Sequence, residues 1–186
     1  MTFILLILSS IISPEDKLTS LMSIVELNPS VDPKPDGKLV LDGTGKMQDY
    51  TYNNHKQIPY NSKKADIKEI EIKNGVTSIG SYAFKECSNL TENLVIPDSI
   101  TSIGEAAFYG CSGLMGDLII PEGVTSIGNR AFRGCSGLTG NLIIPEGVTS
   151  IEPEVFMGCS GLTGNLIIPE GVTSIGSHAF SYCSSL

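Results

Sequence analysis

The sequence predicts an α+β repeat solenoid whose short parallel strands stack along one axis. Its five cysteines are spaced 24 residues apart, and phenylalanine, isoleucine and leucine recur with the same period. Residues 117–140 also match residues 141–164 at 18 of 24 positions. We therefore expect five 24-residue units between residue 70 and the C-terminus. The recurring positions are Cys87, Cys111, Cys135, Cys159 and Cys183; Phe84, Phe108, Phe132, Phe156 and Phe180; Ile79, Ile103, Ile127, Ile151 and Ile175; and Leu90, Leu114, Leu138, Leu162 and Leu186.

Each unit contains two short extended segments and a compact turn. In residues 117–140, the apolar β-formers at 118–120 run into a proline, which predicts a strand that ends at a turn. Residues 124–128 predict a second extended segment. Phe132 and Cys135 follow three residues apart, so we expect them on one face of about one helical turn. The equivalents of the first strand are expected at 94–96, 142–144 and 166–168, stacked as a parallel sheet.

The apolar positions of one unit predict the side chains that face the interior. A single unit buries too little apolar surface to offset the backbone entropy that is lost on folding. Units are therefore stable only when they stack and share buried faces, and the end of such a stack needs a cap. The alternating apolar residues in 38–69 predict a short β-rich N-terminal cap, followed by the solenoid at 70–186. The expected inward set of one unit is Leu118, Ile120, Val124, Ile127, Ala131, Phe132, Cys135 and Leu138.

The N-terminal region divides into two segments that differ in composition. Residues 1–27 allow two interpretations, because the apolar stretch 3–8 is typical of a signal peptide, whereas Ser13 and Pro14 are typical of the start of an N-terminal helix. Residues 28–37 contain three prolines and predict a Pro-rich linker. No apolar run approaches the about 20 residues that span a bilayer, so we expect no transmembrane segment.

The charge balance excludes nucleic acid as a partner. The chain has a formal net charge of −8, and after Glu86 its basic residues are Arg130 and Arg133, apart from His178. Binding to nucleic-acid phosphates requires a basic surface that replaces counterions. The same argument disfavours binding to an anionic membrane surface.

The repeat also accounts for the residue types that catalysis or metal binding would use. The serines and glycines follow the 24-residue period, and no segment resembles a nucleophile elbow or a phosphate-binding glycine loop. There is no C-x-x-C motif, and His55 and His178 lie in unrelated contexts. We therefore expect a non-catalytic protein with no metal site and no cofactor.

The cysteine column allows two arrangements. Neighbouring strands lie about 4.8 Å apart, which is within disulfide reach. The odd number of cysteines and their position on the expected inner face favour buried free thiols instead.

The segment 120–138, IPEGVTSIGNRAFRGCSGL, resembles the BspA-like, treponeme-type leucine-rich repeat, I-P-x-x-V-x-x-I-G-x-x-A-F-x-x-C-x-x-L. The resemblance covers residues 70–186 and predicts a leucine-rich-repeat array. This array departs from the family's familiar 23-residue repeat by one added residue near 139–141. It departs again at Glu152 and Val155, which stand where the pattern has glycine and alanine.

The resemblance implies a protein-binding module of the kind found in secreted or surface proteins that host-associated bacteria and protists use in adhesion. A host or matrix protein is then the expected partner, and a secreted or cell-surface location is expected. Two alternatives stay open. One is an intracellular interaction scaffold with the same geometry. The other is a shortened copy without activity, because the chain stops at Leu186 inside a unit.

Alternation along the first strand predicts a candidate protein-binding face. If Leu118 and Ile120 point inward, Ile119 points outward, and its equivalents form an apolar ladder. A polar ladder lies two residues earlier on the same face. An exposed apolar stripe with polar edges is typical of a binding surface, although β-branched neighbours that shield one another would explain the same pattern. The face comprises Val95, Ile119, Ile143 and Ile167 with Asn93, Asp117, Asn141 and Asn165.

Other surface patterns have competing explanations. The residues that differ most between units lie on the edge of the predicted helical turn, which is a second surface that a partner could read. A threonine column suggests an ice-binding face, but solvent-facing threonine in a strand is the favoured interpretation. Asn89 begins a glycosylation sequon, and the expected burial of Leu90 argues against its use. The edge residues are Asn129, Arg130, Arg133, Pro153, Glu154 and Met157, and the threonines are Thr77, Thr101, Thr125, Thr149 and Thr173.

Overall fold

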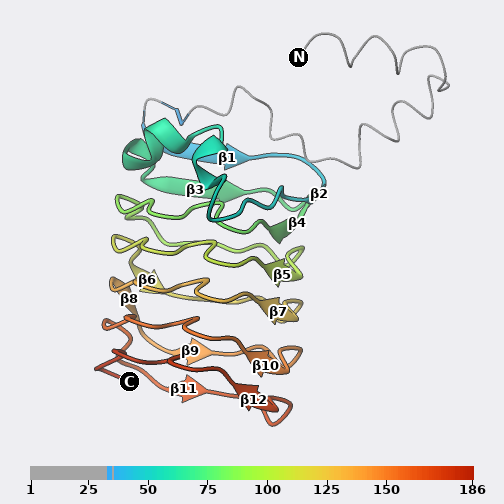
Figure 1. Ribbon diagram of the computed structural model, residues 1–186, viewed down its shortest axis with the longest axis vertical. Coiled ribbons are helices and arrows are strands. Elements are labelled where there is room, and N and C mark those ends of the chain that lie inside the picture. The colour runs from blue at the N-terminus through green and yellow to red at the C-terminus, as the bar shows by residue number, and fades with distance from the viewer. Residues whose placement is uncertain (1–32, 35) are drawn as a thin grey trace, which may run out of the picture.

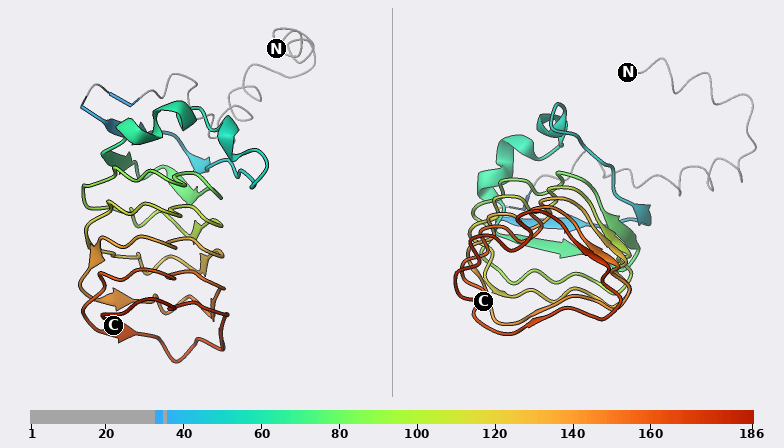
Figure 2. Two further views of the ribbon diagram at one scale, coloured as in Figure 1. Left: turned by 60° about the vertical axis from the view of Figure 1, so that its left-hand side comes forward. Right: turned by 60° about the horizontal axis from the view of Figure 1, so that its bottom comes forward.

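The computed structural model describes residues 33–34 and 36–186, so the predicted signal peptide or N-terminal helix at 1–27 lies outside the described residues. The chain winds in layered rungs, with the N-terminal rungs at the top of Figure 1 and the C-terminal rungs at the bottom. In Figure 2 the windings lie over one another, so equivalent residues of successive units form columns. The repeat solenoid with short parallel strands that the sequence predicts is confirmed.

The first strand ladder is formed by the apolar segment that precedes each turn. β1 (Lys38–Leu41) pairs in parallel with β3 (Glu69–Ile72). β9 (Leu142–Ile143) pairs in parallel with β11 (Leu166–Ile167). These are the strands predicted at 142–144 and 166–168, each one residue shorter at its C-terminal end. The proline that follows has no amide hydrogen, so it cannot continue the ladder.

A second strand ladder runs through the extended segment that follows each turn. Its members are β2 (Gly45–Lys46), β4 (Val76–Ile79), β5 (Ser102–Ile103) and β7 (Ser126–Ile127) in one sheet, and β10 (Ser150–Ile151) and β12 (Ser174–Ile175) in another. From β4 onward its paired strands are parallel at a spacing of one unit, so that Ser78 lies opposite Ser102 and Ser102 lies opposite Ser126. The first pair, β2 with β4, is parallel but has a shifted register.

The second ladder is interrupted once, between the units 117–140 and 141–164, whereas the first ladder is interrupted on both sides of residues 118–120. The predicted strand at 118–120 is not a strand, and the one at 94–96 is reduced to a single parallel bridge between Val95 and Glu71. Instead, β6 (Gly116–Asp117) pairs with β8 (Leu138–Thr139). Gly116 lies opposite Leu138, a separation of 138 − 116 = 22 residues, two short of the period. Within the described residues, β7 and β10 are likewise unpaired across this junction.

A departure from the glycine pattern accounts for the break in the second ladder, between β7 and β10. A Cβ added at Gly128 would lie 2.5 Å from the backbone nitrogen of Glu105, and one added at Gly104 would lie 2.4 Å from that of Ser81. A glycine at this position of a unit therefore lets adjacent rungs approach closely. The unit 141–164 has Glu152 at the equivalent position, so its backbone cannot come as near to the rung before it. An apolar void, too small to admit water, marks the gap and is lined by Ile127, Ile144, Val148, Ser150, Ile151, Val155 and Phe156.

The predicted helical turn is wrong, because the segment around each phenylalanine is a chain of turns. We call this segment, residues 81–87 and its equivalents at 105–111, 129–135, 153–159 and 177–183, the turn edge. The amides of Arg130, Phe132 and Gly134 donate to carbonyls of the next unit, at N···O distances of 3.1, 2.9 and 2.8 Å. The alternate amides, at 131, 133 and 135, donate three residues back within their own unit. An α-helix would use all of these amides internally and leave none for the next rung.

This alternation requires left-handed backbone at two positions of each turn edge. Arg130 has φ 60° and Gly134 has φ 77°. Glycine adopts this conformation freely, whereas a residue with a side chain loses about 1 kcal/mol or more there. Three units have glycine at the second position, and Glu86 and Tyr182 are the exceptions. Within the described residues, the helical elements are two 3₁₀ helices near the N-terminus, η2 (His55–Gln57) and η3 (Asn61–Asp66).

The interior is a set of columns. All eight side chains of the predicted inward set are buried, and the phenylalanine rings of successive units stack with centroids 5.1, 5.3, 5.7 and 5.7 Å apart. Tyr60, which is 84 − 60 = 24 residues before Phe84, stacks on that ring at 6.1 Å. Its hydroxyl donates to the carbonyl of Ala83 at 2.8 Å. The region predicted as a cap therefore continues the phenylalanine column with a tyrosine.

We expect Gly128→Ala to lower the free energy of unfolding by about 1–3 kcal/mol, because its Cβ would press on the backbone of the preceding rung. Gly123→Ala is the matched control, since the nearest atom to its Cβ would be 3.4 Å away. We expect the control to change stability by less than about 0.5 kcal/mol. Urea unfolding followed by circular dichroism measures both variants. Equal losses of stability at the two positions would show that the close approach of adjacent rungs does not require glycine at position 128.

Candidate functional site

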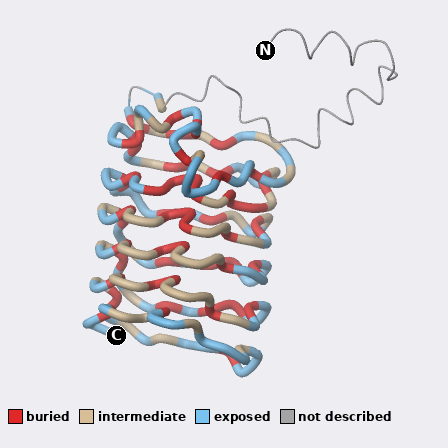
Figure 3. Tube along the Cα trace, in the orientation of Figure 1, coloured by how far each residue is buried: buried red, intermediate tan, exposed pale blue. Residues whose placement is uncertain are grey.

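The predicted apolar ladder lies on the surface. Val95 and Ile119 are 70% and 72% exposed, and Ile143 and Ile167 are 48% and 49% exposed. Their neighbours on either side are buried in the first three units, as strand alternation requires. Figure 3 shows buried and exposed stretches alternating along each rung. In the last unit Ile168 departs from the pattern and is 36% exposed. We call the apolar and polar ladders together the strand face.

Mutual shielding accounts for only part of this surface. Ile143 and Ile167 lie opposite each other in β9 and β11, and each is about half exposed. Val95 forms a bridge to Glu71 and Ile119 lies outside the strands, so these two side chains are not opposite each other in a strand pair, and both are more exposed. All four residues therefore keep a large apolar area in contact with solvent, where another molecule could bury it.

Three side chains of the polar ladder contact the neighbouring rung. The side-chain oxygen of Asn141 accepts a hydrogen bond from the amide of Asn165 at 2.8 Å. The side-chain oxygens of Asn93 and Asp117 lie against Gly116 and Gly140, where an added Cβ would be 2.2 and 2.1 Å away. These side chains therefore cover the backbone of the next rung. Sequence reasoning missed this role, although a glycine just before three of the polar positions signals it.

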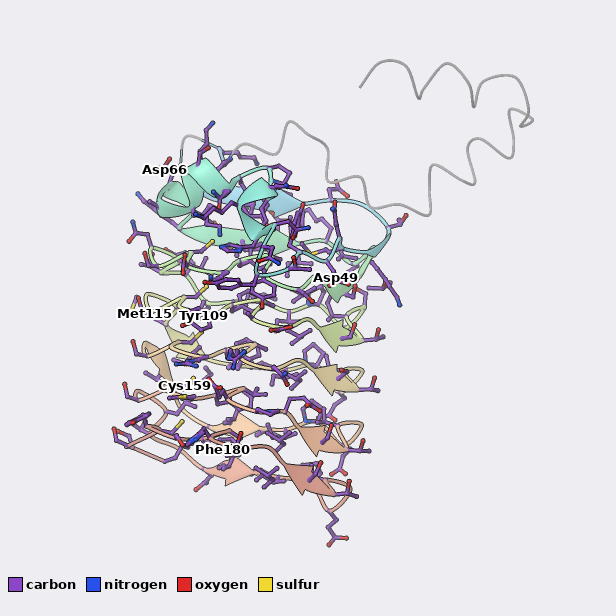
Figure 4. All side chains as sticks on the ribbon, viewed as in Figure 1. Asp49, Asp66, Tyr109, Met115, Cys159 and Phe180 are labelled. Carbon is purple, nitrogen blue, oxygen red and sulfur yellow. The ribbon has the colours of Figure 1, made fainter. Side chains whose placement is uncertain are left out.

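A groove follows the N-terminal half of the strand face. One hollow of about 750 Å³ is lined by Glu71, Asn93, Val95 and Met115, among others. A second, of about 440 Å³, shares Asn93 and Val95 and extends to Ile119. Met115 is 51% exposed and projects at one margin of the array (Figure 4). The sequence analysis missed it, because the equivalent positions in later units are threonines.

The N-terminal end of the groove is charged. Lys38 forms ion pairs with Glu69 at 2.6 Å and Glu71 at 3.1 Å, and Lys73 also pairs with Glu71. Hydrogen bonds to Glu69 and Glu71 raise the pKa of Lys38, and hydrogen bonds from Lys73 and Lys38 lower the pKa of Glu71. Since these groups are exposed to solvent, the pairs contribute little to stability. The face is thus ionic at its first rungs and apolar from Val95 onward.

The turn edge, the competing surface, is occupied by contacts within the chain. Arg130 donates to Glu154 at 2.9 Å, and Arg133 donates to the same carboxylate. The guanidinium of Arg133 also lies 5.6 Å from the ring of Tyr109. The residues that vary most between units therefore join the two units on either side of the interrupted ladders.

The comparisons with known proteins agree with this geometry. A family model described as the BspA type leucine-rich repeat region matches residues 56–186 with six copies. The chain belongs to the BspA-type leucine-rich-repeat family. The count is one above the five units predicted, and the match begins within the predicted cap, near Tyr60. No curated protein matches the chain.

Solved structures of leucine-rich repeat proteins share the fold. A leucine-rich repeat protein from Eubacterium ventriosum is 29% identical, with a TM-score of 0.60 over 77% of this chain and 36% of its own. A leucine rich cell surface protein from Faecalibacterium prausnitzii is 28% identical, with a TM-score of 0.63 over 82% of this chain and 47% of its own. The T. pallidum leucine rich repeat protein, at 21% identity and a TM-score of 0.58, covers 81% of this chain and 78% of its own, and shows the fold alone. The chain spans less than half of the first two relatives.

The BspA-type cysteine column is a set of buried free thiols, as predicted. Four of the thiols donate to phenylalanine carbonyls 27 residues earlier, at 3.0 to 3.2 Å. Burial raises the pKa of Cys87 and Cys159 to about 12, and it also raises the pKa of Cys111 and Cys135 well above the usual value of a thiol. A thiol reacts as the thiolate, so these groups are unreactive at neutral pH.

The remaining candidate sites have structural explanations. Thr101, Thr125 and Thr173 donate their hydroxyls to carbonyls one rung earlier, as expected of ordinary solvent-facing threonine. The side-chain amide of Asn89, the sequon residue, donates to the carbonyl of Ala65 at 2.8 Å. In residues 33–34 and 36–186, no group of three or more histidine, cysteine and acidic side chains is placed to hold a metal. That part of the chain also has no helix long and apolar enough to cross a bilayer.

The thiol column predicts a pH dependence of stability. The unfolded thiols have a pKa of about 8.5, and burial raises the folded value, so the folded state keeps its protons to higher pH. The thiol contribution to stability is therefore complete below about pH 8.5 and is lost as the pH rises toward about 12. Cys135→Ala removes one such group and should make the fall with pH less steep. Urea unfolding of both proteins at about pH 7 and about pH 10 measures this change in slope.

The control for this prediction is a thiol-reagent titration. Few thiols should react in the folded protein, and five should react after denaturation. Rapid reaction of all five in the folded protein, or identical pH slopes for the parent chain and Cys135→Ala, would contradict burial of the column.

Proposed function

We propose that this BspA-type array is a non-catalytic protein-binding module that holds its partner on the strand face. Leucine-rich repeats are in general protein-interaction modules, and this chain carries that fold. The observation that supports the strand face is the line of four apolar side chains, Val95, Ile119, Ile143 and Ile167, each about half exposed or more. The second ladder exposes mainly threonine and serine, with Ile175 of the last unit as an exposed apolar residue, so the continuous apolar line lies on the strand face.

The location that fits this role is the cell surface or the extracellular space, where a host or matrix protein is the partner. Two points support it. The Faecalibacterium prausnitzii relative is a leucine rich cell surface protein, and residues 3–8 have the composition of a signal-peptide core. The N-terminal residue of the mature protein, determined by mass spectrometry, tests this: removal of the leader supports secretion, and an intact N-terminus supports an intracellular scaffold.

A pair of lysine substitutions tests the binding face. Ile143→Lys places a charge in the apolar ladder, whereas Thr149→Lys places the same charge on the second ladder of the same unit, at an exposed position. We expect Ile143→Lys to weaken binding of a protein captured from serum or matrix by about tenfold or more, and Thr149→Lys to leave it unchanged. Surface plasmon resonance measures both, and circular dichroism checks that each variant is folded.

Arg133→Glu separates the strand face from the turn edge. If the partner binds Ile143→Lys as tightly as the parent chain but loses affinity for folded Arg133→Glu, the turn edge is the recognition surface and the proposal is wrong. If neither folded variant changes binding, the array has no binding role on either surface.

A further inference from the structure

A second ladder of unpaired charges runs beside the apolar one. In each of four units the proline after the strand segment is followed by an acidic residue, and all four of these residues are exposed. Each lies three residues after a ladder member, so its backbone is at most about 10 Å away. Within the part of the chain that the structure describes, none of the four forms an ion pair. This acidic ladder comprises Asp98, Glu122, Glu146 and Glu170.

The repeat places these carboxylates where they repel one another. The stacked rings of successive units lie 5.1 to 5.7 Å apart, and like charges at about that spacing are unfavourable even in high dielectric. The opposite side of the apolar ladder has Asn93, Asp117, Asn141 and Asn165, with a single charge among them. The apolar line is therefore bordered asymmetrically, with negative charge concentrated along one side. A ligand with cations along the matching side would relieve this repulsion.

The spacing of the apolar ladder selects the conformation of that ligand. An α-helix presents one face every turn, about 5.4 Å along its axis, which matches the 5.1 to 5.7 Å between the centroids of the stacked phenylalanine rings of successive units. An extended strand presents one face every second residue, about 6.6 Å apart, so it loses register with the units by about 1 Å at each step and by about 3 Å over the four rungs. A helix laid along the solenoid axis can thus place successive apolar residues on Val95, Ile119, Ile143 and Ile167. A strand cannot follow all four.

We infer that the strand face binds a basic amphipathic helix of the partner protein, with the apolar side of the helix on the apolar ladder and its lysine or arginine side chains along the acidic ladder. This inference rests on the proposed function and names the partner's binding element. A second copy of the chain fits the surface poorly, because each copy carries a net charge of −8. An anionic membrane would be repelled by the same four carboxylates.

Three designed peptides of 18 residues, about 27 Å long as helices, test the ligand. The first has leucine on one helical face and lysine beside it. The second has the same composition with leucine and lysine alternating, as in a strand. The third is the first with glutamate in place of lysine. We expect the first to bind with a dissociation constant at least about tenfold below those of the other two, and to weaken as salt is added. Fluorescence anisotropy of labelled peptides measures this.

Protein variants then locate the peptide. Glu122→Gln/Glu146→Gln should weaken binding of the lysine helix severalfold and flatten its salt dependence. Asp66→Asn/Glu86→Gln changes the net charge by the same amount at exposed positions away from the acidic ladder, and should leave binding unchanged. Ile143→Lys should weaken binding by about tenfold or more. Equal effects of the two double variants, or equal binding of the alternating peptide, would overturn the inference.

The outcome also separates this inference from the proposed function. Suppose that the parent chain does not bind the lysine helix, but that a captured protein binds the parent chain and not Ile143→Lys. The inference of a helical ligand would then be overturned, and the strand face would remain the binding surface. Binding of the lysine helix that Ile143→Lys does not weaken would overturn the inference, because the helix would then lie elsewhere.

Discussion

The amides of the turn edge donate to the following rung, and this set of hydrogen bonds continues through every unit. The amides of Phe84, Phe108, Phe132 and Phe156 bond to the next unit at N···O distances between 2.7 and 2.9 Å. Both strand ladders are interrupted at the junction between 117–140 and 141–164, yet the turn-edge bonds and the stacked rings cross it. The array holds together at this junction through its turn edge, with the contacts of Arg130 and Arg133 to Glu154 at the same place.

The strand face depends on that stacking. Its residues are aligned because the columns of the interior keep each rung in place. The exposed fraction of each apolar side chain on this face is lower where neighbouring rungs pair as strands. Ile143 and Ile167, where β9 and β11 pair, are about half exposed, whereas Val95 and Ile119 are exposed by about 70%. The most prominent apolar groups thus lie where the ladder is least regular. A partner would meet them first, beside the groove that Asn93, Val95 and Met115 line.

Periodicity explains how much could be predicted from the sequence. Burial repeats with the 24-residue period, so the inward set, the thiol column and the outward position of Ile119 were all predictable from one unit. The backbone conformation of the turn edge was harder to predict. The three-residue spacing of Phe132 and Cys135 suits a chain of turns as well as a helix, and only the hydrogen bonds to the next rung distinguish the two. The break between β7 and β10 lies beside Glu152, which replaces the glycine that brings the other rungs close together, and a contact between units of this kind is not visible in one unit. Met115 and the acidic ladder were missed because neither follows the apolar pattern on which the analysis relied.

Native-state hydrogen exchange at the junction tests this account most directly. The amides of Phe132 and Gly134 cross the junction, and those of Phe108 and Gly110 make the same bonds one unit earlier. If the turn edge holds the array together, the two pairs should exchange with protection factors within about tenfold of each other. If the amides of Phe132 and Gly134 exchanged more than about a hundredfold faster than those of Phe108 and Gly110, as fast as the amides of the interrupted strand ladders, the turn edge would open together with those ladders. That result would contradict the account.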